Sequence, residues 1–195
     1  MTRKKSPPQK TKRPYHILAM LMIGTGLLVL GVASLVVLPK PQATAESSPG
    51  YSTIPVEVNY PSPELSLTDL QGNPVSLEDH LGQVVLVNNW ATWCPPCKAE
   101  MPALQTFFEK HQSQNFTIIA IEAGDPVFEV ADFVKQYGLT FQVWPDPTQK
   151  ATVAFRNPGL PSSYVIDRSG NVRLAWTGAI KLDSLEKYVT PLLEE

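Results

Sequence analysis

Cysteine and histidine are scarce in this chain, which has two cysteines and three histidines among 195 residues. The histidines, His16, His80 and His111, are scattered along the chain, and none flanks the cysteines. Metal sites need several ligands at short spacings. The sequence therefore predicts no metal site. Internal repeats are also lacking, and the one biased tract is a Pro-rich stretch at residues 39–63.

Acidic residues are missing from the first 45 residues, which carry seven Lys and Arg. The other nine basic residues and all 18 acidic ones lie in residues 46–195, so the net charge of −2 hides a main part near about −9. An acidic main part argues against nucleic acid as a partner, because phosphate binding needs a basic surface. The length fits one domain plus an appendage.

Residues 17–38 contain no charged side chain and follow six basic residues. At about 1.5 Å per residue, this stretch spans the roughly 30 Å of a bilayer core. The positive-inside rule keeps the basic residues 1–16 in the cytoplasm. We therefore expect a single-pass anchor in the cell membrane and a domain outside the cytoplasm.

A cleaved signal peptide is the alternative for this segment. Ala43-Thr44-Ala45 fits the small-residue cleavage pattern, and cleavage would release a secreted form. The apolar region of a signal peptide usually has about 7–15 residues, which favours the uncleaved anchor. Both interpretations place the domain on the same side of the membrane.

Six prolines make residues 39–63 a semi-extended linker, and the globular pattern covers residues 64–195. Apolar runs predict strands at 84–90 and 116–121, and the stretch between them, 98–111, predicts a helix. A strand, a helix and a strand at this spacing indicate a right-handed parallel crossover.

The remaining elements give an α/β domain, in which helices cover both faces of a mixed sheet. Asp125 is the expected N-cap of the next helix, and Gly138 its end. Asp183 and Glu186 fit a capping box that opens the last helix. Between these helices we expect a strand at 141–144, a short helix at 150–155 and a hairpin of strands 163–167 and 172–177.

Cys94 and Cys97 stand three positions apart, where the first predicted strand leads into the helix. A C-x-x-C beside a βαβ pattern is typical of thioredoxin-like redox sites. A purely structural disulfide is the alternative, but closing so short a loop contributes little stability.

Residues 88–102, NNWATWCPPCKAEMP, closely resemble the thioredoxin-like family of membrane-tethered ResA, TlpA and CcmG (DsbE) proteins. Gly159-Leu160-Pro161, followed by SSYVID, resembles the second signature of that family, a cis-proline loop that leads into a strand. The resemblance covers residues 64–195. It implies a thioredoxin-like fold and a thiol–disulfide oxidoreductase that uses the cysteine pair and no other cofactor.

Within this resemblance, Cys94 is the expected nucleophile, partly exposed at the helix N-cap, where the helix dipole lowers the pKa of a thiol. Cys97, one turn further and more buried, would resolve the mixed disulfide. Glu100 lies one further turn along the helix and matches a family glutamate tied to thiol proton chemistry. Asn88 occupies the position of the buried Asp of thioredoxin, which directs the base role towards Glu100 or water.

Five further residues are expected to bind substrate. Trp93 would shield the site, Pro95 and Pro96 restrict the spacer, and the resemblance makes Leu160 and a cis Pro161 the docking loop. Two other positions stand out. Asn89 replaces an aromatic residue usual in the family, and Glu122 is interpreted as loop polarity after the second strand.

The sequence thus predicts a membrane-anchored enzyme that reduces protein disulfides outside the cytoplasm, such as those of apocytochrome c before haem attachment. A membrane partner would supply the electrons. Two alternatives stay open: an oxidant that installs disulfides in secreted proteins, and a copper-binding thioredoxin-like module. The family's copper-delivery members use a histidine ligand and wider cysteine spacing, which this chain lacks.

Overall fold

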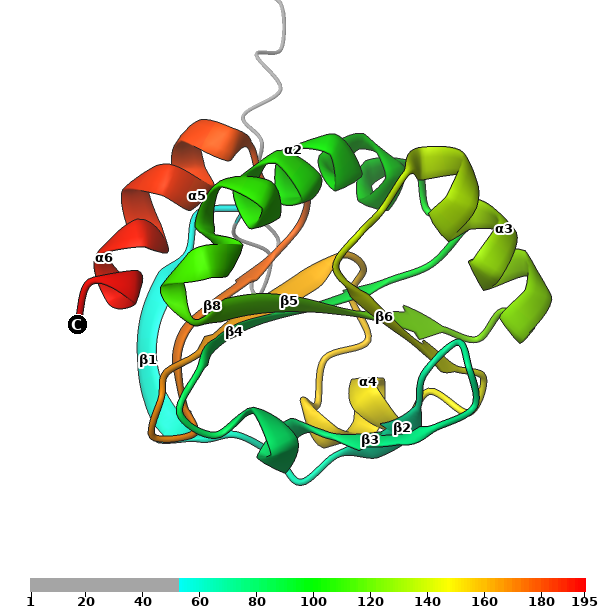
Figure 1. Ribbon diagram of the computed structural model, residues 1–195, viewed down its shortest axis with the longest axis horizontal. Coiled ribbons are helices and arrows are strands. Elements are labelled where there is room, and N and C mark those ends of the chain that lie inside the picture. The colour runs from blue at the N-terminus through cyan, green and yellow to red at the C-terminus, as the bar shows by residue number, and fades with distance from the viewer. Residues whose placement is uncertain (1–52) are drawn as a thin grey trace, which may run out of the picture. The chain divides into compact units, whose positions relative to one another are not determined.

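A six-stranded sheet in the order β1-β8-β7-β4-β5-β6 organises the part of the chain that the computed structural model describes, residues 53–195 (Figure 1). Its strands are β1 (Val56–Pro61), β4 (Val84–Trp90), β5 (Phe116–Ala123), β6 (Gln142–Asp146), β7 (Ser162–Ile166) and β8 (Asn171–Thr177). β4, β5 and β6 run parallel, whereas β7 is antiparallel to β4, and β8 to β7. The predicted mixed sheet is confirmed.

Helices cover both faces of this sheet (Figure 1). One face carries α2 (Pro95–His111), α3 (Val127–Tyr137), α5 (Leu182–Tyr188) and α6 (Thr190–Leu193). The other carries α4 (Lys150–Ala154) and a small hairpin of β2 (Ser66–Thr68) and β3 (Pro74–Ser76), which leads into the short helix η1 (Leu77–His80). The helix between β4 and β5 is the predicted parallel crossover.

β4 is buried along its whole length, because both of its faces are covered. Val84, Leu86 and Trp90 belong to the apolar cluster beneath α2 and α3. Val85 and Val87 belong to the cluster on the opposite face. A strand buried on both sides reads as an apolar run, and residues 84–87 supply the run from which the sequence predicted this strand.

α2 begins at the cysteines, and its interior contains Pro102. α3 ends at Gly138, which adopts a left-handed conformation with φ 64°, as the sequence predicted. The expected N-cap of α3 was wrong. Pro126 holds that position, because the Asp125 carboxylate is engaged by the backbone N–H and the hydroxyl of Thr92.

The predicted capping box at the last helix was also wrong. The N-cap of α5 is Lys181, without a side-chain hydrogen bond. Glu186 instead accepts from Lys110 Nζ at 2.8 Å and contacts His111 Nε2 at 3.2 Å. This carboxylate therefore joins α5 to the end of α2 instead of capping its own helix.

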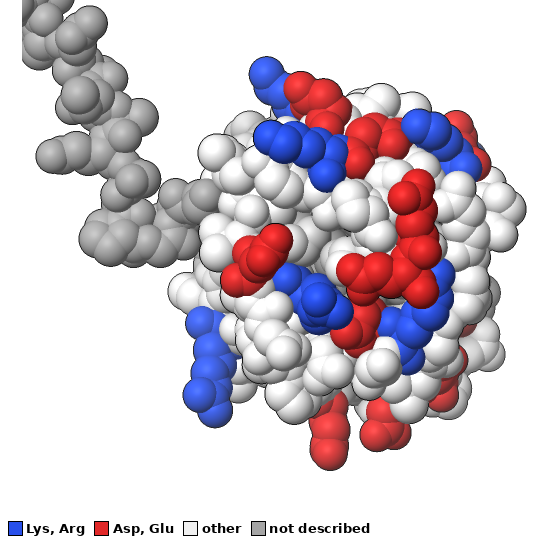
Figure 2. Space-filling model, turned by 90° about the vertical axis from the view of Figure 1, so that its left-hand side faces the viewer, with Lys and Arg blue, Asp and Glu red and all other residues white. Residues whose placement is uncertain are grey.

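Acidic and basic side chains are interspersed on the face that carries β1, α5 and α6 (Figure 2). Arg173 on β8 pairs with Asp167 at 3.3 Å and with Glu195 at 3.7 Å. Arg168 donates to the main-chain oxygens of Leu192 and Leu193. These contacts fix the C-terminal segment to the β7–β8 hairpin.

The predicted start of the domain at residue 64 was too late. β1 lies inside the predicted linker and pairs with β8, so sheet pairing holds this proline-flanked segment in the domain. The predicted segments 1–16 and 17–38 lie outside the described residues. Among residues 53–195, none of the helices has the length and apolar character that a membrane crossing requires.

Candidate functional site

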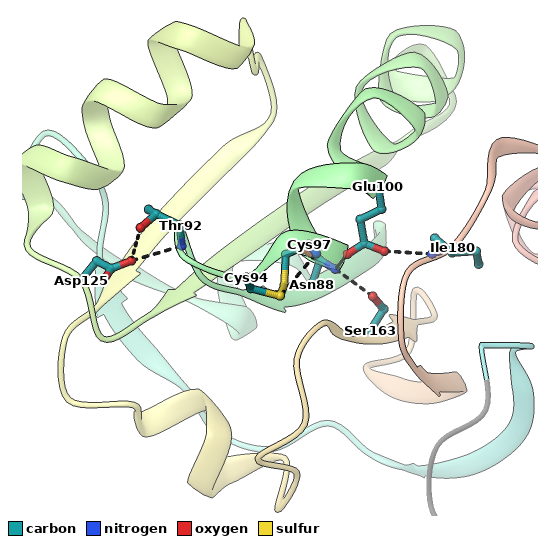
Figure 3. The surroundings of a disulfide bond; sticks show 8 residues. All are labelled: Asn88, Thr92, Cys94, Cys97, Glu100, Asp125, Ser163 and Ile180. Atoms are coloured by element: carbon teal, nitrogen blue, oxygen red, sulfur yellow. Dashed lines mark hydrogen bonds between the residues drawn. A yellow bond between two sulfur atoms is a disulfide. The ribbon is translucent and has the colours of Figure 1, made fainter. Parts of the chain in front are cut away.

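Cys94 and Cys97 form a disulfide at the N-terminus of α2, with their Cα atoms 5.3 Å apart (Figure 3). Cys94 is the N-cap, and its Sγ accepts the backbone N–H of Cys97 at 3.3 Å. Pro95 and Pro96 occupy the first two helical positions, where a missing N–H costs no helical hydrogen bond. The Sγ of Cys94 therefore faces the positive end of the helix dipole.

Both cysteines are more enclosed than expected. Cys97 is fully buried, and Cys94 is 3% exposed in this oxidised state, so the prediction of a partly exposed Cys94 was wrong. The two cysteines belong to the apolar cluster of Trp90 and Met101, and Leu160 packs against that cluster. The exposed side chains next to the disulfide are those of Trp93, Pro95 and Pro96.

A buried carboxyl group lies one turn beyond Cys97 on the same helix. Glu100 is 1% exposed. Its Oε1 accepts from Asn88 Nδ2 at 2.8 Å, and its Oε2 accepts the backbone N–H of Ile180 at 3.0 Å (Figure 3). The second N–H of Asn88 is donated to Ser163 Oγ at 2.9 Å. Strand β4, helix α2 and the loop after β8 thus converge on one carboxyl group, and Ser163 of β7 holds the Asn88 amide.

Burial raises the pKa of Glu100 to about 7, and the N–H groups of Ile180 and Asn88 only partly oppose this shift, because they stabilise the ionised form. A carboxyl group with a pKa near neutrality both gains and loses a proton at working pH. Asn88, which replaces the acid of thioredoxin, holds this carboxyl group instead of titrating itself.

The predicted cis peptide bond is present between Leu160 and Pro161. The adjacent Ser162 pairs with Asn89 near the C-terminal end of β4. This loop and the cysteines therefore lie at the same end of the central strands. The Pro161 carbonyl accepts the N–H of Gly178 at 2.7 Å. Pro161 is buried, whereas Leu160 is half-buried.

Trp93 directly precedes Cys94 in the chain, and its side chain is 64% exposed. The expected shielding of the cysteines therefore comes from the apolar cluster and not from a folded-in Trp93 indole. Asn89 contacts Ser162 Oγ at 3.5 Å, and its own Oδ1 has no hydrogen-bond partner. In place of an aromatic ring, this strand position holds a polar contact to the 160–162 loop.

The interpretation of Glu122 as loop polarity was wrong, because this side chain is fully buried. Both of its carboxyl oxygens accept the backbone N–H of Asp125, at 3.0 and 3.3 Å. Burial, together with the nearby Asp125 carboxyl, raises the pKa of Glu122 to about 8. A lone acidic residue at a strand end looks like loop polarity in sequence, and its burial follows only from the pairing of β5 between β4 and β6.

Among residues 53–195, no group of three or more His, Cys, Asp or Glu side chains is placed to hold a metal ion. The groups that the site itself presents are two sulfur atoms and a titrating carboxyl group.

These features define a class. A mixed sheet, a disulfide at the N-terminus of the helix after its central strand, and a cis-proline loop at the same end of the central strands constitute a thioredoxin-like thiol–disulfide oxidoreductase.

Comparison with known proteins agrees with this class. Residues 58–175 match the model of the AhpC/TSA family, and the chain belongs to that family. The thiol-disulfide oxidoreductase ResA of Geobacillus kaustophilus (strain HTA426) is 33% identical over 134 residues, which cover 69% of this chain and 77% of that protein. ResA of Bacillus anthracis is 35% identical over 134 residues, 69% of this chain and 78% of that protein.

Solved structures give the same result. A thiol:disulfide interchange protein of Chlorobium tepidum TLS superposes with a TM-score of 0.63 at 29% identity, covering 71% of this chain and 99% of that chain. A DsbF homologue of Corynebacterium diphtheriae gives a TM-score of 0.66 at 26% identity, covering 74% and 96%. The chain is thus a thiol–disulfide oxidoreductase of ResA type, and the predicted resemblance is confirmed.

Proposed function

We propose that this enzyme reduces disulfides in protein substrates outside the cytoplasmic membrane, to which residues 17–38 anchor it. The observation that carries the exchange chemistry is the buried Glu100 carboxyl one turn from Cys97, because resolution of a mixed disulfide by Cys97 requires loss of its thiol proton. The reductive direction rests on the resemblance to ResA. The basic residues 1–16 and the uncharged segment after them support the anchoring.

In the first step, the Cys94 thiolate attacks one sulfur of a substrate disulfide. That S–S bond breaks, a Cys94–substrate disulfide forms, and the second substrate sulfur leaves as a thiolate that takes up a proton. The N-terminus of α2 stabilises the attacking thiolate, since the Cys97 N–H donates to Cys94 Sγ and the helix dipole favours negative charge.

In the second step, the Cys97 thiol gives its proton to Glu100 and attacks Cys94 Sγ. The mixed disulfide breaks, the remaining substrate sulfur leaves as a thiolate, and the Cys94–Cys97 disulfide forms. Two electrons have then passed to the substrate. A membrane partner returns two electrons and two protons to the enzyme to restore the dithiol.

The protein substrate would dock on the exposed surface beside the disulfide. Trp93, Pro95 and Pro96 supply its exposed side chains, and Leu160 and Pro161 supply the main chain of the neighbouring loop. Aromatic rings contribute large contact areas in such interfaces. By its resemblance to ResA, the chain would take apocytochrome c before haem attachment as its substrate.

The test uses the reduced full chain and a peptide that contains one C-x-x-C disulfide. We expect stoichiometric appearance of two peptide thiols, loss of the reaction in Cys94→Ser, and wild-type behaviour in Val153→Ala, which alters an exposed side chain on α4. Full activity in Cys94→Ser would overturn the assignment.

The same preparation separates the alternatives. A midpoint potential that lets the oxidised chain oxidise peptide dithiols would favour the oxidant, since about 30 mV corresponds to a tenfold change in the equilibrium. Tight stoichiometric Cu(I) binding by the reduced chain, without disulfide exchange, would favour the copper module.

A further inference from the structure

A second chain of contacts reaches the cysteines from the side opposite Glu100. The chain from Ala91 to Cys94 forms a tight turn, in which the Cys94 N–H donates to the Ala91 carbonyl at 3.2 Å. Within this turn, Thr92 makes two hydrogen bonds to Asp125 Oδ2, from its backbone N–H at 3.1 Å and from its hydroxyl at 2.5 Å (Figure 3). The Asp125 carboxylate therefore fixes the 91–94 turn, which leads into α2 at its N-cap Cys94.

Asp125 is in turn hydrogen-bonded to Glu122, the single acidic residue of β5. The Asp125 backbone N–H donates to both Glu122 oxygens, and the two side chains share a hydrogen bond. Glu122 lies opposite Trp90 in the pairing of β4 with β5, so it sits directly beside the start of the 91–94 turn. Because two ionised carboxylates cannot hydrogen-bond to each other, the contact requires a proton on one of them.

The surroundings place that proton on Glu122. It is fully buried, whereas Asp125 is half-buried and receives two further donors from Thr92. The charged groups that face Glu122 are both acidic, Asp125 from the loop and Asp146 from β6. β4 carries no charged residue, and Glu100 of α2 is engaged by Asn88 and Ile180.

We propose that protonated Glu122 is a positioning residue for the cysteine pair: its carboxyl group donates to Asp125, which fixes Thr92 and so the turn that presents Cys94. The role of this turn in exchange rests on the proposed function of Cys94. When Glu122 loses its proton, its negative charge faces those of Asp125 and Asp146. The hydrogen bonds from Thr92 to Asp125 then weaken. Raised pH would therefore loosen the turn.

The direct test follows the Thr92 backbone amide by NMR in the oxidised, ¹⁵N-labelled full chain from pH 6 to pH 10. In this state the two cysteines do not titrate. We expect a chemical-shift transition with a midpoint near pH 8 in the wild type and in the control Glu129→Gln, an exposed acid in the first turn of α3. Glu122→Gln keeps an N–H donor for Asp125 but cannot ionise, so its transition should vanish.

A second variant guards against loss of folding in the first. Asp125→Asn removes the charge opposite Glu122 and should lower the midpoint, because that charge opposes ionisation of Glu122. A transition that persists unchanged in either Glu122→Gln or Asp125→Asn would overturn the proposal. So would a wild-type Thr92 signal without a transition between pH 7 and pH 9.

The functional readout compares rates of peptide-disulfide reduction by Glu122→Gln and Glu129→Gln. Their ratio should rise about threefold between pH 6.5 and pH 9, the effect expected for one net hydrogen bond. If the ratio of rates does not change with pH while Thr92 titrates as expected, the proposed positioning of Cys94 by this turn is overturned. Absence of exchange in the wild type would instead overturn the proposed function, and the Thr92 titration, which needs no activity, would still decide the hydrogen-bond chain.

Discussion

Asn88 Nδ2 donates to Glu100 Oε1 over 2.8 Å, and this bond joins the strand before the cysteines to the helix after them. Both residues are fully or almost fully buried. In thioredoxin an acid occupies the strand position that Asn88 holds here, so this chain keeps a titrating group near the cysteines but places it on α2. The residue at the strand position, Asn88, donates the hydrogen bond that orients the Glu100 carboxyl group.

Removal of this donor should move the pH profile of the reaction. Asn88→Ala takes away a hydrogen bond that favours ionised Glu100, so the pKa of Glu100 should rise further above about 7. A hydrogen bond to a charged group is worth about 1.5–3 kcal/mol, or roughly 1–2 pH units. The measurement is the pH dependence of mixed-disulfide resolution.

Ser163→Ala is the matched control, because it removes the other partner of Asn88 and leaves its bond to Glu100 in place. We expect a smaller displacement of the profile than in Asn88→Ala. Equal profiles in the wild type and in Asn88→Ala would show that Glu100 does not govern the resolution step.

Glu100 should also make stability depend on pH. Its pKa is raised from 4.5 in the unfolded chain to about 7 in the folded protein, so the folded state holds a proton that the unfolded state has released. This contribution to stability is fully present below about pH 4.5 and is lost as the pH rises through about 7. The loss amounts to about 3 kcal/mol.

Denaturant unfolding of the wild type and of Glu100→Gln at pH 4.5 and pH 8 measures this loss. Gln cannot ionise, and a rotated Asn88 amide can accept from it, since Asn88 Oδ1 has no partner. The variant should therefore lack the part of the pH dependence that is due to Glu100. Parallel curves for the two proteins would refute the raised pKa.

The contacts of Glu186 should affect the free energy of unfolding but not the rate of disulfide exchange. Its carboxylate accepts from Lys110, His111 and Thr190, and it joins α5 to α2 far along the helix from the cysteines. We expect Glu186→Ala to lower the unfolding free energy by about 1 kcal/mol, and Lys110→Met by less than about 0.5, because Lys110 is exposed. Rates of disulfide exchange should be unchanged in both.

Trp93 should affect substrate binding alone. Its side chain is 64% exposed, so Trp93→Ala should change the unfolding free energy by no more than about 0.5 kcal/mol. The KM for a protein disulfide should rise, whereas reduction of a small disulfide should keep its rate. Val153→Ala, which is also strongly exposed but on α4, is the control. An equal effect of both variants on KM would remove Trp93 from the docking surface.

The sequence predicted what depends on local pattern. β4 begins with the apolar run 84–87, α3 ends at a glycine, and the C-x-x-C lies where a strand leads into a helix. The elements that it misplaced depend on distant contacts. Asp125 carries the signature of an N-cap but binds Thr92, 33 residues away. Glu186 completes an apparent capping box but binds Lys110 across the helix pair.

The functional site could be predicted only in part, because some of its contacts also join distant segments. The cysteines, Glu100 and the proline loop stand in recognisable motifs. The burial of Glu122 and the Asn88–Glu100 bond arise when β5 and α2 are folded against β4, and no local pattern signals either one. Sequence spacing also overestimated the exposure of Cys94, because the apolar cluster around it assembles from several segments.

The central claim is that Cys94 attacks substrate disulfides and that Cys97 resolves the product. The most direct measurement is mass spectrometry of the complex trapped when reduced Cys97→Ser reacts with a disulfide-bonded peptide. We expect a stable adduct linked through Cys94 and no adduct with Cys94→Ser. An adduct through Cys97 that forms in Cys94→Ser as fast as the Cys94 adduct forms in Cys97→Ser would contradict it.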